Sequence, residues 1–233
     1  MNKDTLGDRV KRYEAVPKHL LTRRTPVVIR VDGKAFHTFT KNCDKPFDSS
    51  VMDAMVYAAR ETSKHMQGFQ LAYVQSDEAS FLLTDYDTLD TEAWYDYEIN
   101  KLVSITASMF TAHFNDFWQT CKVMDDKVNL AMFDARAFNV PEDEWQNVFL
   151  WRQRDWERNS IQMLARSNFR QKELQNKGVL EMHMMLLNKD VDPELRTDQQ
   201  KYGTFILKDH TNYFARADYA WLTKIANIQK VYE

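Results

Sequence analysis

The sequence predicts an α+β fold, in which flanking helices cover an antiparallel sheet and a mainly helical C-terminal portion follows. Residues 27–31, VVIRV, form an apolar run typical of a buried strand. Residues 51–66 repeat apolar side chains at helical spacing, directly after Asp48, a residue type that favours a helix start. Two further strand-like runs, 70–75 and 79–84, then follow one another with only a short acidic turn between them.

The later elements complete an order of strand, helix, strand, strand, helix, strand. That order is typical of the ferredoxin-like split βαβ sheet and of the polymerase palm, whereas a doubly wound parallel sheet would need strict alternation. We therefore expect a polymerase palm-like sheet. The remaining predicted elements are a long helix over about 92–118, a strand over 133–140, a helix over 142–166 with Pro141 at its first turn, a shorter helix after Gly178, and a late strand over 203–207.

Nothing in the sequence separates two independent domains. It has no internal repeat, no low-complexity tract and no obvious linker, and its 233 residues include only five glycines and five prolines. A chain of this length with 44% hydrophobic residues is long enough for a substantial core. We expect a palm-like catalytic core in residues 1–140 and a mainly helical part in residues 141–233, packed on it as one compact unit.

Composition excludes several classes of partner and location. The net charge is −3, so no global positive field recruits nucleic acid or anionic lipid, and nucleic-acid binding would need a local basic patch. Cys43 and Cys121 lie far apart and outside any CxxC motif, which indicates two free thiols in a reducing compartment. The N-terminus lacks a signal-like apolar stretch, and no run approaches 18 apolar residues. We expect a soluble, cytoplasmic protein without a membrane segment.

Two aspartates follow predicted strands at places that an antiparallel sheet can bring together. Asp32 ends the first strand, and Asp77 lies in the turn of the following hairpin. Neighbouring carboxylates repel one another unless a cation lies between them, and Mg²⁺ prefers such oxygen ligands. Gly33 would let the chain turn away and expose its carbonyl to the same metal. Either motif alone is as well explained by an ordinary turn; together they favour a site for two Mg²⁺ ions.

The hairpin turn QSDE contains no glycine, asparagine or proline. We interpret this as a rigid turn that holds Asp77 in place.

No phosphate-binding loop of the GxxxxGK[ST] or GxGxxG type occurs in the sequence. A nucleotide would therefore depend on metals and on scattered basic residues, although each lysine is equally typical of a solvated surface. Asp48 is a helix cap that could also border a phosphate or sugar site, and His37 is either semi-buried or a proton carrier. The basic candidates are Arg30, Lys34, Lys45 and Lys101.

Five segments together resemble the tRNA-His guanylyltransferase family and its Thg1-like relatives. They are RVDGKAFHTFT, KPFD, YVQSDEASF, NKLVSITASMFTAHF and WRQRDWERNSI, in that order, and the resemblance covers roughly residues 10–208. Members of this family add nucleotides in the 3′-to-5′ direction, with a palm-like core and Mg²⁺. The resemblance therefore implies a cytoplasmic nucleotidyltransferase that acts on the 5′ end of tRNA, with nucleoside triphosphates as substrates and a homotetrameric assembly.

The resemblance also implies roles for individual positions. Asp32 and Asp77 match the metal carboxylates, with Gly33 as the backbone-carbonyl ligand, while Glu78 and His37 complete the catalytic set. Arg152 and Asp155 match framework positions. Independently of the resemblance, oligomerisation could assemble an RNA-binding surface from Arg152, Arg154 and Arg158 with Arg166 and Arg170, although these residues are also typical of a solvated helix face. The nucleotide-binding candidates are Arg30, Lys34, Ala35, Phe36, His37, Lys45, Asp48, Ser76, Lys101 and Asn159.

The implied reaction has two steps. A 5′-monophosphate on the RNA is first activated by ATP or GTP, with pyrophosphate leaving. The 3′-hydroxyl of the incoming nucleotide then attacks the activated 5′ phosphate. Both steps are displacements at phosphorus, so charge neutralisation and positioning should dominate.

Three departures from the family pattern bear on the substrate. Glu157 stands at the position of the histidine linked to tRNA-His selectivity, Tyr97 and Glu98 replace an arginine pair, and KPND has become KPFD. The run RNSI at residues 158–161 resembles the bacterial and phage Thg1-like branch, which favours template-directed repair of 5′-truncated RNA over the alternative, addition of a single guanosine to tRNA-His. A palm-type nucleotide cyclase or phosphotransferase, or a non-catalytic RNA-binding module, would share parts of the pattern and stays an alternative.

Overall fold

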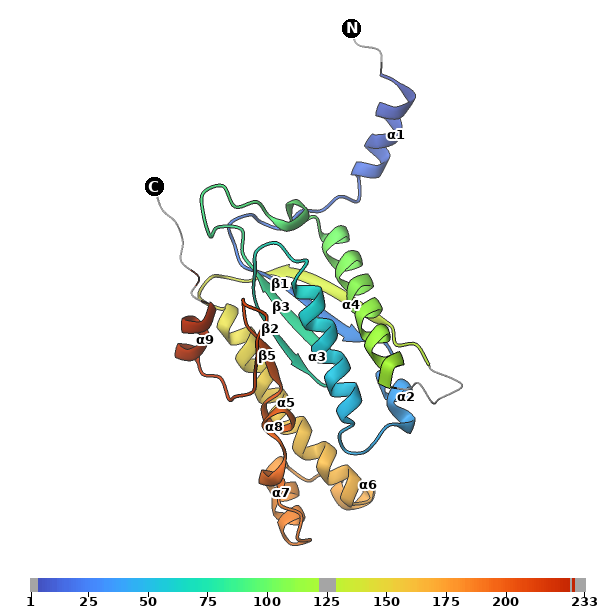
Figure 1. Ribbon diagram of the computed structural model, residues 1–233, viewed down its shortest axis with the longest axis vertical. Coiled ribbons are helices and arrows are strands. Elements are labelled where there is room, and N and C mark those ends of the chain that lie inside the picture. The colour runs from blue at the N-terminus through green and yellow to red at the C-terminus, as the bar shows by residue number, and fades with distance from the viewer. Residues whose placement is uncertain (1–3, 122–128, 227, 229–233) are drawn as a thin grey trace.

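An antiparallel sheet lies at the centre of the part of the chain that the computed structural model describes, residues 4–121, 129–226 and 228 (Figure 1). The order across the sheet is β4-β1-β3-β2-β5-β6, and each neighbouring pair is antiparallel. Strands β1 to β4 have the split βαβ arrangement, so the predicted α+β fold is confirmed. The strands are β1 (Val27–Gly33), β2 (Phe69–Gln75), β3 (Glu78–Leu83), β4 (Phe133–Asn139), β5 (Thr204–Ile206) and β6 (Asn212–Tyr213).

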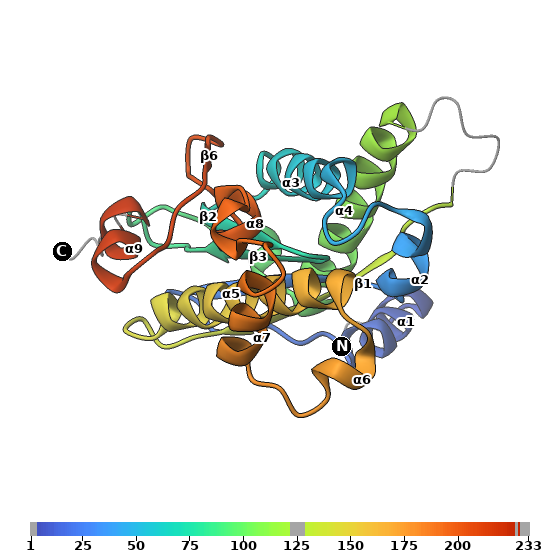
Figure 2. The same ribbon diagram turned by 90° about the horizontal axis from the view of Figure 1, so that it is seen from below.

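Helices α3 (Ser49–Ser63) and α4 (Ile99–Cys121) cover one face of the sheet (Figure 2). Successive side chains of a strand point to opposite faces, so Val27, Ile29 and Val31 of β1 enter the core beneath these two helices. Asp48 caps α3, as its position in the sequence predicts. This face carries the largest hydrophobic core of the described residues.

Helices α5 (Trp145–Asn168) and α9 (Tyr219–Ala226) cover the opposite face (Figure 2). Val28 and Leu82 point into this second core, where they meet Phe149 of α5. Because both faces of the sheet are covered, β1 has a continuous apolar run instead of the alternation of a half-exposed strand.

The C-terminal part supplies helices and also a strand. β5 pairs with β2, so this part of the chain extends the sheet. A third apolar cluster, around Ala165 and Leu186, joins the end of α5 to the short elements beyond it. Those elements are α6 (Gln171–Leu174), α7 (Val179–Leu187), the 3-10 turn η3 (Pro193–Leu195) and α8 (Asp198–Tyr202).

The peripheral elements differ in how they contact the body. Helix α1 (Leu6–Ala15) stands away from it and buries none of its residues (Figure 1). α2 (Phe36–Phe39) and the 3-10 turn η1 (Thr40–Asn42) instead follow β1 and pack against the end of α4. Within the described ranges, no helix combines the length and the apolar character needed to cross a bilayer.

Two predicted helix starts were wrong. The helix expected from residue 92 begins at Ile99, because a 3-10 turn η2 (Trp94–Tyr97) precedes it and contains Tyr95 and Asp96 at φ 49° and 53°. Such left-handed residues cannot continue a right-handed helix. The helix expected after Pro141 begins at Trp145, since the Glu144 amide donates to the Pro141 carbonyl and closes a turn first.

Candidate active site

The end of β1 and the β2–β3 hairpin turn lie side by side. Asp32 is the cross-strand partner of Glu78, and the Gly33 amide donates to the backbone carbonyl of Asp77 at 3.0 Å. The antiparallel register therefore brings the two aspartates together, at the place where the sequence predicts a shared site. β4 adds Asp134 on the other side of Asp32.

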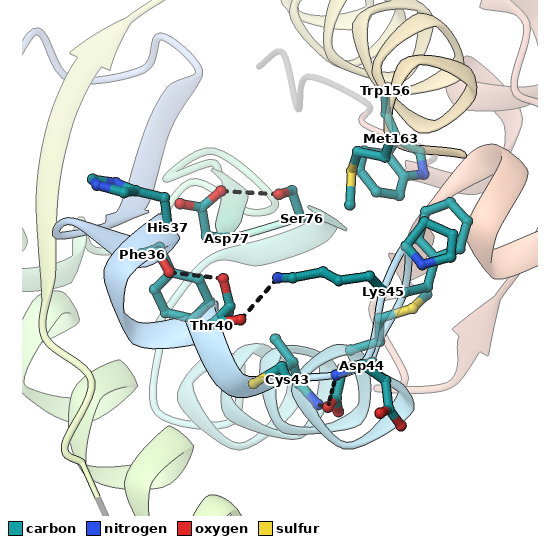
Figure 3. Close-up of a pocket in the computed structure, with 15 residues that line it drawn as sticks. Phe36, His37, Thr40, Cys43, Asp44, Lys45, Ser76, Asp77, Trp156 and Met163 are labelled. Atoms are coloured by element: carbon teal, nitrogen blue, oxygen red, sulfur yellow. Dashed lines mark hydrogen bonds between the residues drawn. The ribbon is translucent and has the colours of Figure 1, made fainter. Parts of the chain in front are cut away.

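The hairpin turn is held in a conformation that favours glycine. Ser76 lies at φ 49°, a left-handed backbone that is less favourable for an L-residue by about 1–2 kcal/mol. Its hydroxyl donates to Oδ1 of Asp77 at 3.0 Å (Figure 3). The turn is thus strained as well as short, and the paired strands on both sides keep Asp77 in place.

The two aspartates are incompletely neutralised. Burial raises the pKa of the Asp77 carboxyl, the Ser76 hydroxyl lowers it, and the nearby Asp32 charge raises it further. Asp32 has a loose ion pair with Arg136, 3.7 Å from Nη2 to Oδ2, and its side chain is 44% exposed. Of the residues that the structure describes, no lysine, arginine or histidine pairs with Asp77 within 4.0 Å. A bound cation would relieve this repulsion.

The donor set suits Mg²⁺ bound together with a nucleotide. In the described ranges, no group of three or more His, Cys, Asp or Glu side chains could hold a metal alone. Mg²⁺ typically takes one or two carboxylates and completes its octahedron with waters and substrate phosphates. Asp32, Asp77 and the Gly33 carbonyl provide such a partial set.

Gly33 is required for the close approach of these segments. A Cβ at this position would lie 2.5 Å from the Phe36 ring and 3.0 Å from the Asp77 Cβ. Any larger residue would therefore push Asp77 or Phe36 away.

Glu78 faces a pair of arginines. Its Oε1 accepts from Arg152 Nε at 2.6 Å and its Oε2 from Arg152 Nη2 at 2.8 Å, and Arg30 Nε lies 3.5 Å from Oε1. Burial raises the pKa of Glu78, and the two arginines lower it again. Both carboxylate oxygens are engaged, so Glu78 contacts the arginines whereas Asp32 and Asp77 keep oxygens free.

A cavity of about 250 Å³ opens beside Asp77 (Figure 3). Ser76 and Asp77 form one wall, and Trp156 and Met163 of α5 lie across from them. Phe36 forms part of the lining, and its ring packs against Phe114 and Phe133 in the core. The loop over residues 43–48 and the start of α3 complete the lining.

The loop over residues 43–48 is fixed by Asp48. Oδ1 accepts from the Val51 amide and Oδ2 from the Asp44 amide, each at 3.1 Å. Lys45 of the same loop also lines the cavity, and its amine donates to the Thr40 carbonyl at 2.8 Å (Figure 3). A lysine held by one carbonyl is available to a phosphate.

The connection from β1 to α2 and the start of α2 hold three further predicted residues. The Lys34 amide donates to the Met132 carbonyl at 2.8 Å, and the Lys34 side chain is exposed. Ala35 lies at φ 50°, so a second left-handed residue borders the acidic pair. His37 is exposed at the cavity rim, with Nε2 3.1 Å from the Thr38 hydroxyl.

Helix α5 carries Trp156 and Met163 to the cavity at a spacing of two turns. Asn159 lies between them along the helix and donates to Asp155 Oδ2 at 3.3 Å. Trp156 also meets Phe47 edge to face, with ring centroids 6.2 Å apart. Phe47, one of the departures from the family pattern, therefore contributes to the aromatic side of the cavity.

Lys101 is not brought to the cavity. It lies in the first turn of α4 and pairs with Glu98 at 3.5 Å. Phe114, where α4 meets Phe36, is 13 residues further along the helix, which corresponds to roughly 20 Å. Within one chain this position is remote from the two aspartates.

The three arginines expected on an RNA-binding surface separate into two kinds. Arg154 and Arg158 are exposed, and Arg158 pairs with Asp155 at 2.6 Å. Arg152 is only 12% exposed and belongs to the Glu78 cluster, so the expectation of a free surface cation was wrong for it.

Four functional candidates were missed in the sequence. Trp156 and Met163 could have been found from their spacing on the helix that carries Asn159. Arg136 and Asp134 alternate along β4, but only the register with β1 shows that they flank Asp32.

Comparisons with known proteins agree on one family. The family model described as tRNAHis guanylyltransferase matches residues 7–141. The tRNA(His) guanylyltransferase of Schizosaccharomyces pombe is 37% identical over 156 residues, covering 65% of this chain and 56% of that protein. The enzyme of the same name from Neurospora crassa is 33% identical over 157 residues, covering 65% and 51%. The chain thus spans a little over half the length of these curated relatives.

Solved structures of the family share the fold over nearly the whole chain. A bacterial tRNA(His) guanylyltransferase-like protein in complex with ATP is 39% identical with a TM-score of 0.85, covering 91% of this chain and 92% of that one. The tRNA(His) guanylyltransferase of Saccharomyces cerevisiae has a TM-score of 0.79 at 22% identity, covering 93% and 98%, and supports the fold alone. The resemblance seen in the motifs is confirmed: this chain belongs to the tRNA-His guanylyltransferase family.

Proposed function

We propose that this protein is a Mg²⁺-dependent nucleotidyltransferase that adds nucleotides in the 3′-to-5′ direction to the 5′ end of tRNA or tRNA-like RNA. The observation that carries the proposal is the incompletely neutralised pair Asp32 and Asp77, of which Asp77 lines a cavity that also contains aromatic side chains and Lys45. Family membership supports the reaction class, and the relatives named above include a protein bound to ATP.

Asp32, Asp77 and the Gly33 carbonyl would hold the Mg²⁺ ions. When bound, they would neutralise charge that develops on the attacking and leaving oxygens at phosphorus. The chain itself contributes positioning: the fixed hairpin holds Asp77, and Glu78 keeps Arg30 and Arg152 beside Asp32.

The cavity is the proposed site of the activating ATP or GTP. Lys45 would contact phosphate, while Phe36, Phe47 and Trp156 offer apolar surface for the base or sugar. His37 at the rim would carry a proton during activation of the RNA 5′ phosphate. Asp48 and Ser76 line this site, whereas Lys34, Ala35 and Asn159 are close in the sequence to residues that line it, and all five remain nucleotide-binding proposals.

We further propose template-directed 5′-end repair in preference to addition of one guanosine. Glu157, at the position of the family histidine linked to tRNA-His, forms a two-pronged ion pair with Arg216, Nε–Oε1 3.0 Å and Nη2–Oε2 3.2 Å. The Glu157 carboxylate is thus paired with an arginine of the same chain, and this position offers no imidazole to an RNA. A homotetramer and a cytoplasmic location stay predictions from the resemblance.

The test is extension of a labelled, 5′-truncated tRNA with ATP and all four nucleoside triphosphates. Repair predicts one added nucleotide at each templated position, and Asp77→Ala should abolish addition while its circular dichroism stays unchanged. Extension that ignores the opposite strand would instead support single-guanosine addition. Absence of any extension would refute the proposal and leave the cyclase or RNA-binding alternatives.

A further inference from the structure

An exposed tryptophan lies beside the acidic site but outside its cavity. Trp151 of α5 is 53% exposed, one residue before the buried Arg152. The guanidinium carbon of Arg152 lies 4.8 Å from its ring centroid, and that of Arg30 lies 5.4 Å away. Glu78 accepts two hydrogen bonds from Arg152 and lies 3.5 Å from Arg30 Nε. The ring therefore contacts two cations that both pair with Glu78, although much of it faces solvent.

The position of this ring relative to the acids follows from the strand geometry. Arg30 and Asp32 are two residues apart on β1 and share a face, which separates their Cα atoms by roughly 7 Å. Trp151 contacts Arg30, so its ring lies next to the strand residue that shares a face with Asp32. It does not line the cavity proposed for ATP or GTP. A ligand on Trp151 would therefore lie outside that cavity.

Cations continue from Trp151 along the same side of α5. Arg154 and Arg158 follow it by three and seven residues, so the three side chains share one helix face. Both arginines are exposed, and in the described part of the chain Arg154 has no acidic partner within 4.0 Å. An exposed aromatic ring followed by arginines is the combination that binds single-stranded or terminal nucleotides, by base stacking and phosphate contact.

We propose that Trp151 is the stacking platform for the terminal base at the 5′ end of the RNA acceptor, with Arg154 and Arg158 contacting the phosphates next to it. The inference rests on the proposed function and names how the RNA end is held. Stacking does not depend on which base is present, because every base has a π-face. An enzyme that repairs ends of different sequence needs this kind of contact.

The test measures equilibrium binding of a 5′-monophosphorylated hairpin RNA that carries 2-aminopurine as its 5′-terminal base, without nucleotides or Mg²⁺. Binding to the wild-type protein should quench the probe. Trp151→Ala should abolish quenching and weaken RNA binding roughly ten-fold, in line with the loss of one stacked base. Trp151→Phe keeps a ring and should restore most of both, which separates stacking from a local folding defect.

Controls distinguish this site from the other sites of the protein. Tyr13→Ala removes an aromatic residue of similar exposure from α1 and should change neither signal. ATP affinity should be the same in Trp151→Ala as in the wild type. Equal quenching in Trp151→Ala, equal quenching of a probe placed deep in the stem, or a matching loss of ATP affinity would each overturn the proposal. Since no turnover is measured, the result does not depend on whether extension occurs.

Discussion

The Glu78–Arg152 pair makes a quantitative prediction about stability. The two side chains are only 11% and 12% exposed, and two hydrogen bonds of 2.6 and 2.8 Å join them. Removing one partner of such a pair strands a buried charge and typically costs about 3–5 kcal/mol. Arg30, whose Nε lies 3.5 Å from Glu78, would leave the carboxylate one partner in an Arg152→Met variant, so we expect the lower end, about 3 kcal/mol. For a chain of this size that is a fall in Tm of roughly 6–12 °C.

The assay is urea unfolding of wild type, Arg152→Met, and Arg152→Met with Glu78→Gln. The double variant removes the stranded charge and should be more stable than the single one. The pH dependence supplies a second check. Loss of Arg152 raises the pKa of Glu78 in the folded protein further above its unfolded value of 4.5. The Arg152→Met variant therefore loses stability as the pH rises from 4.5 to that raised pKa. The stability penalty should therefore be smaller at pH 5 than at pH 8.

Two results would refute this reasoning. A loss below about 1 kcal/mol for Arg152→Met would mean that the pair behaves like an exposed ion pair. If the double variant loses as much free energy of unfolding as its two single variants lose together, the two side chains act independently.

Three further predictions concern the acidic site. Because burial and Asp32 raise the pKa of Asp77, its charged form destabilises the metal-free protein at neutral pH, so Asp77→Asn should raise Tm in EDTA while abolishing nucleotide addition. Mg²⁺ with ATP should stabilise the wild type, by about 2.7 kcal/mol at one hundred times Kd, and an unchanged Tm in thermal scans would count against joint binding. Gly33→Ala should cost about 1–3 kcal/mol and most of the activity, because its Cβ meets Phe36 and Asp77. Gly7→Ala, whose Cβ meets only the Thr5 hydroxyl at 3.7 Å, is the matched control and should leave both activity and Tm near wild type.

The sequence predicts those features that depend on local pattern. The strand over 27–31 and the acidic hairpin were placed correctly because apolar runs and turns are encoded within a few residues. The convergence of Asp32 and Asp77 could be anticipated because an antiparallel sheet allows few alternatives for adjacent strands.

Other features depend on contacts between distant segments. The Glu78–Arg152 pair joins residues 74 positions apart, and no local periodicity in the sequence predicts this contact. The same holds for the contact between the Phe47 and Trp156 rings, which form one side of the cavity. Lys101 stays a prediction: the resemblance implies a nucleotide-binding role, whereas within one chain the length of α4 carries that lysine away from the cavity.

The hydrogen bond from the Gly33 amide to the Asp77 carbonyl has a consequence for divergence within the family. It ties both acid-bearing segments into the middle strands of the sheet, so their separation cannot drift without disrupting the sheet itself. The opposite side of the cavity is built from a surface loop and one helix face, where exchanges such as Asn to Phe at Phe47 leave the sheet untouched. A substitution on that side can therefore reshape the cavity without moving the two acids.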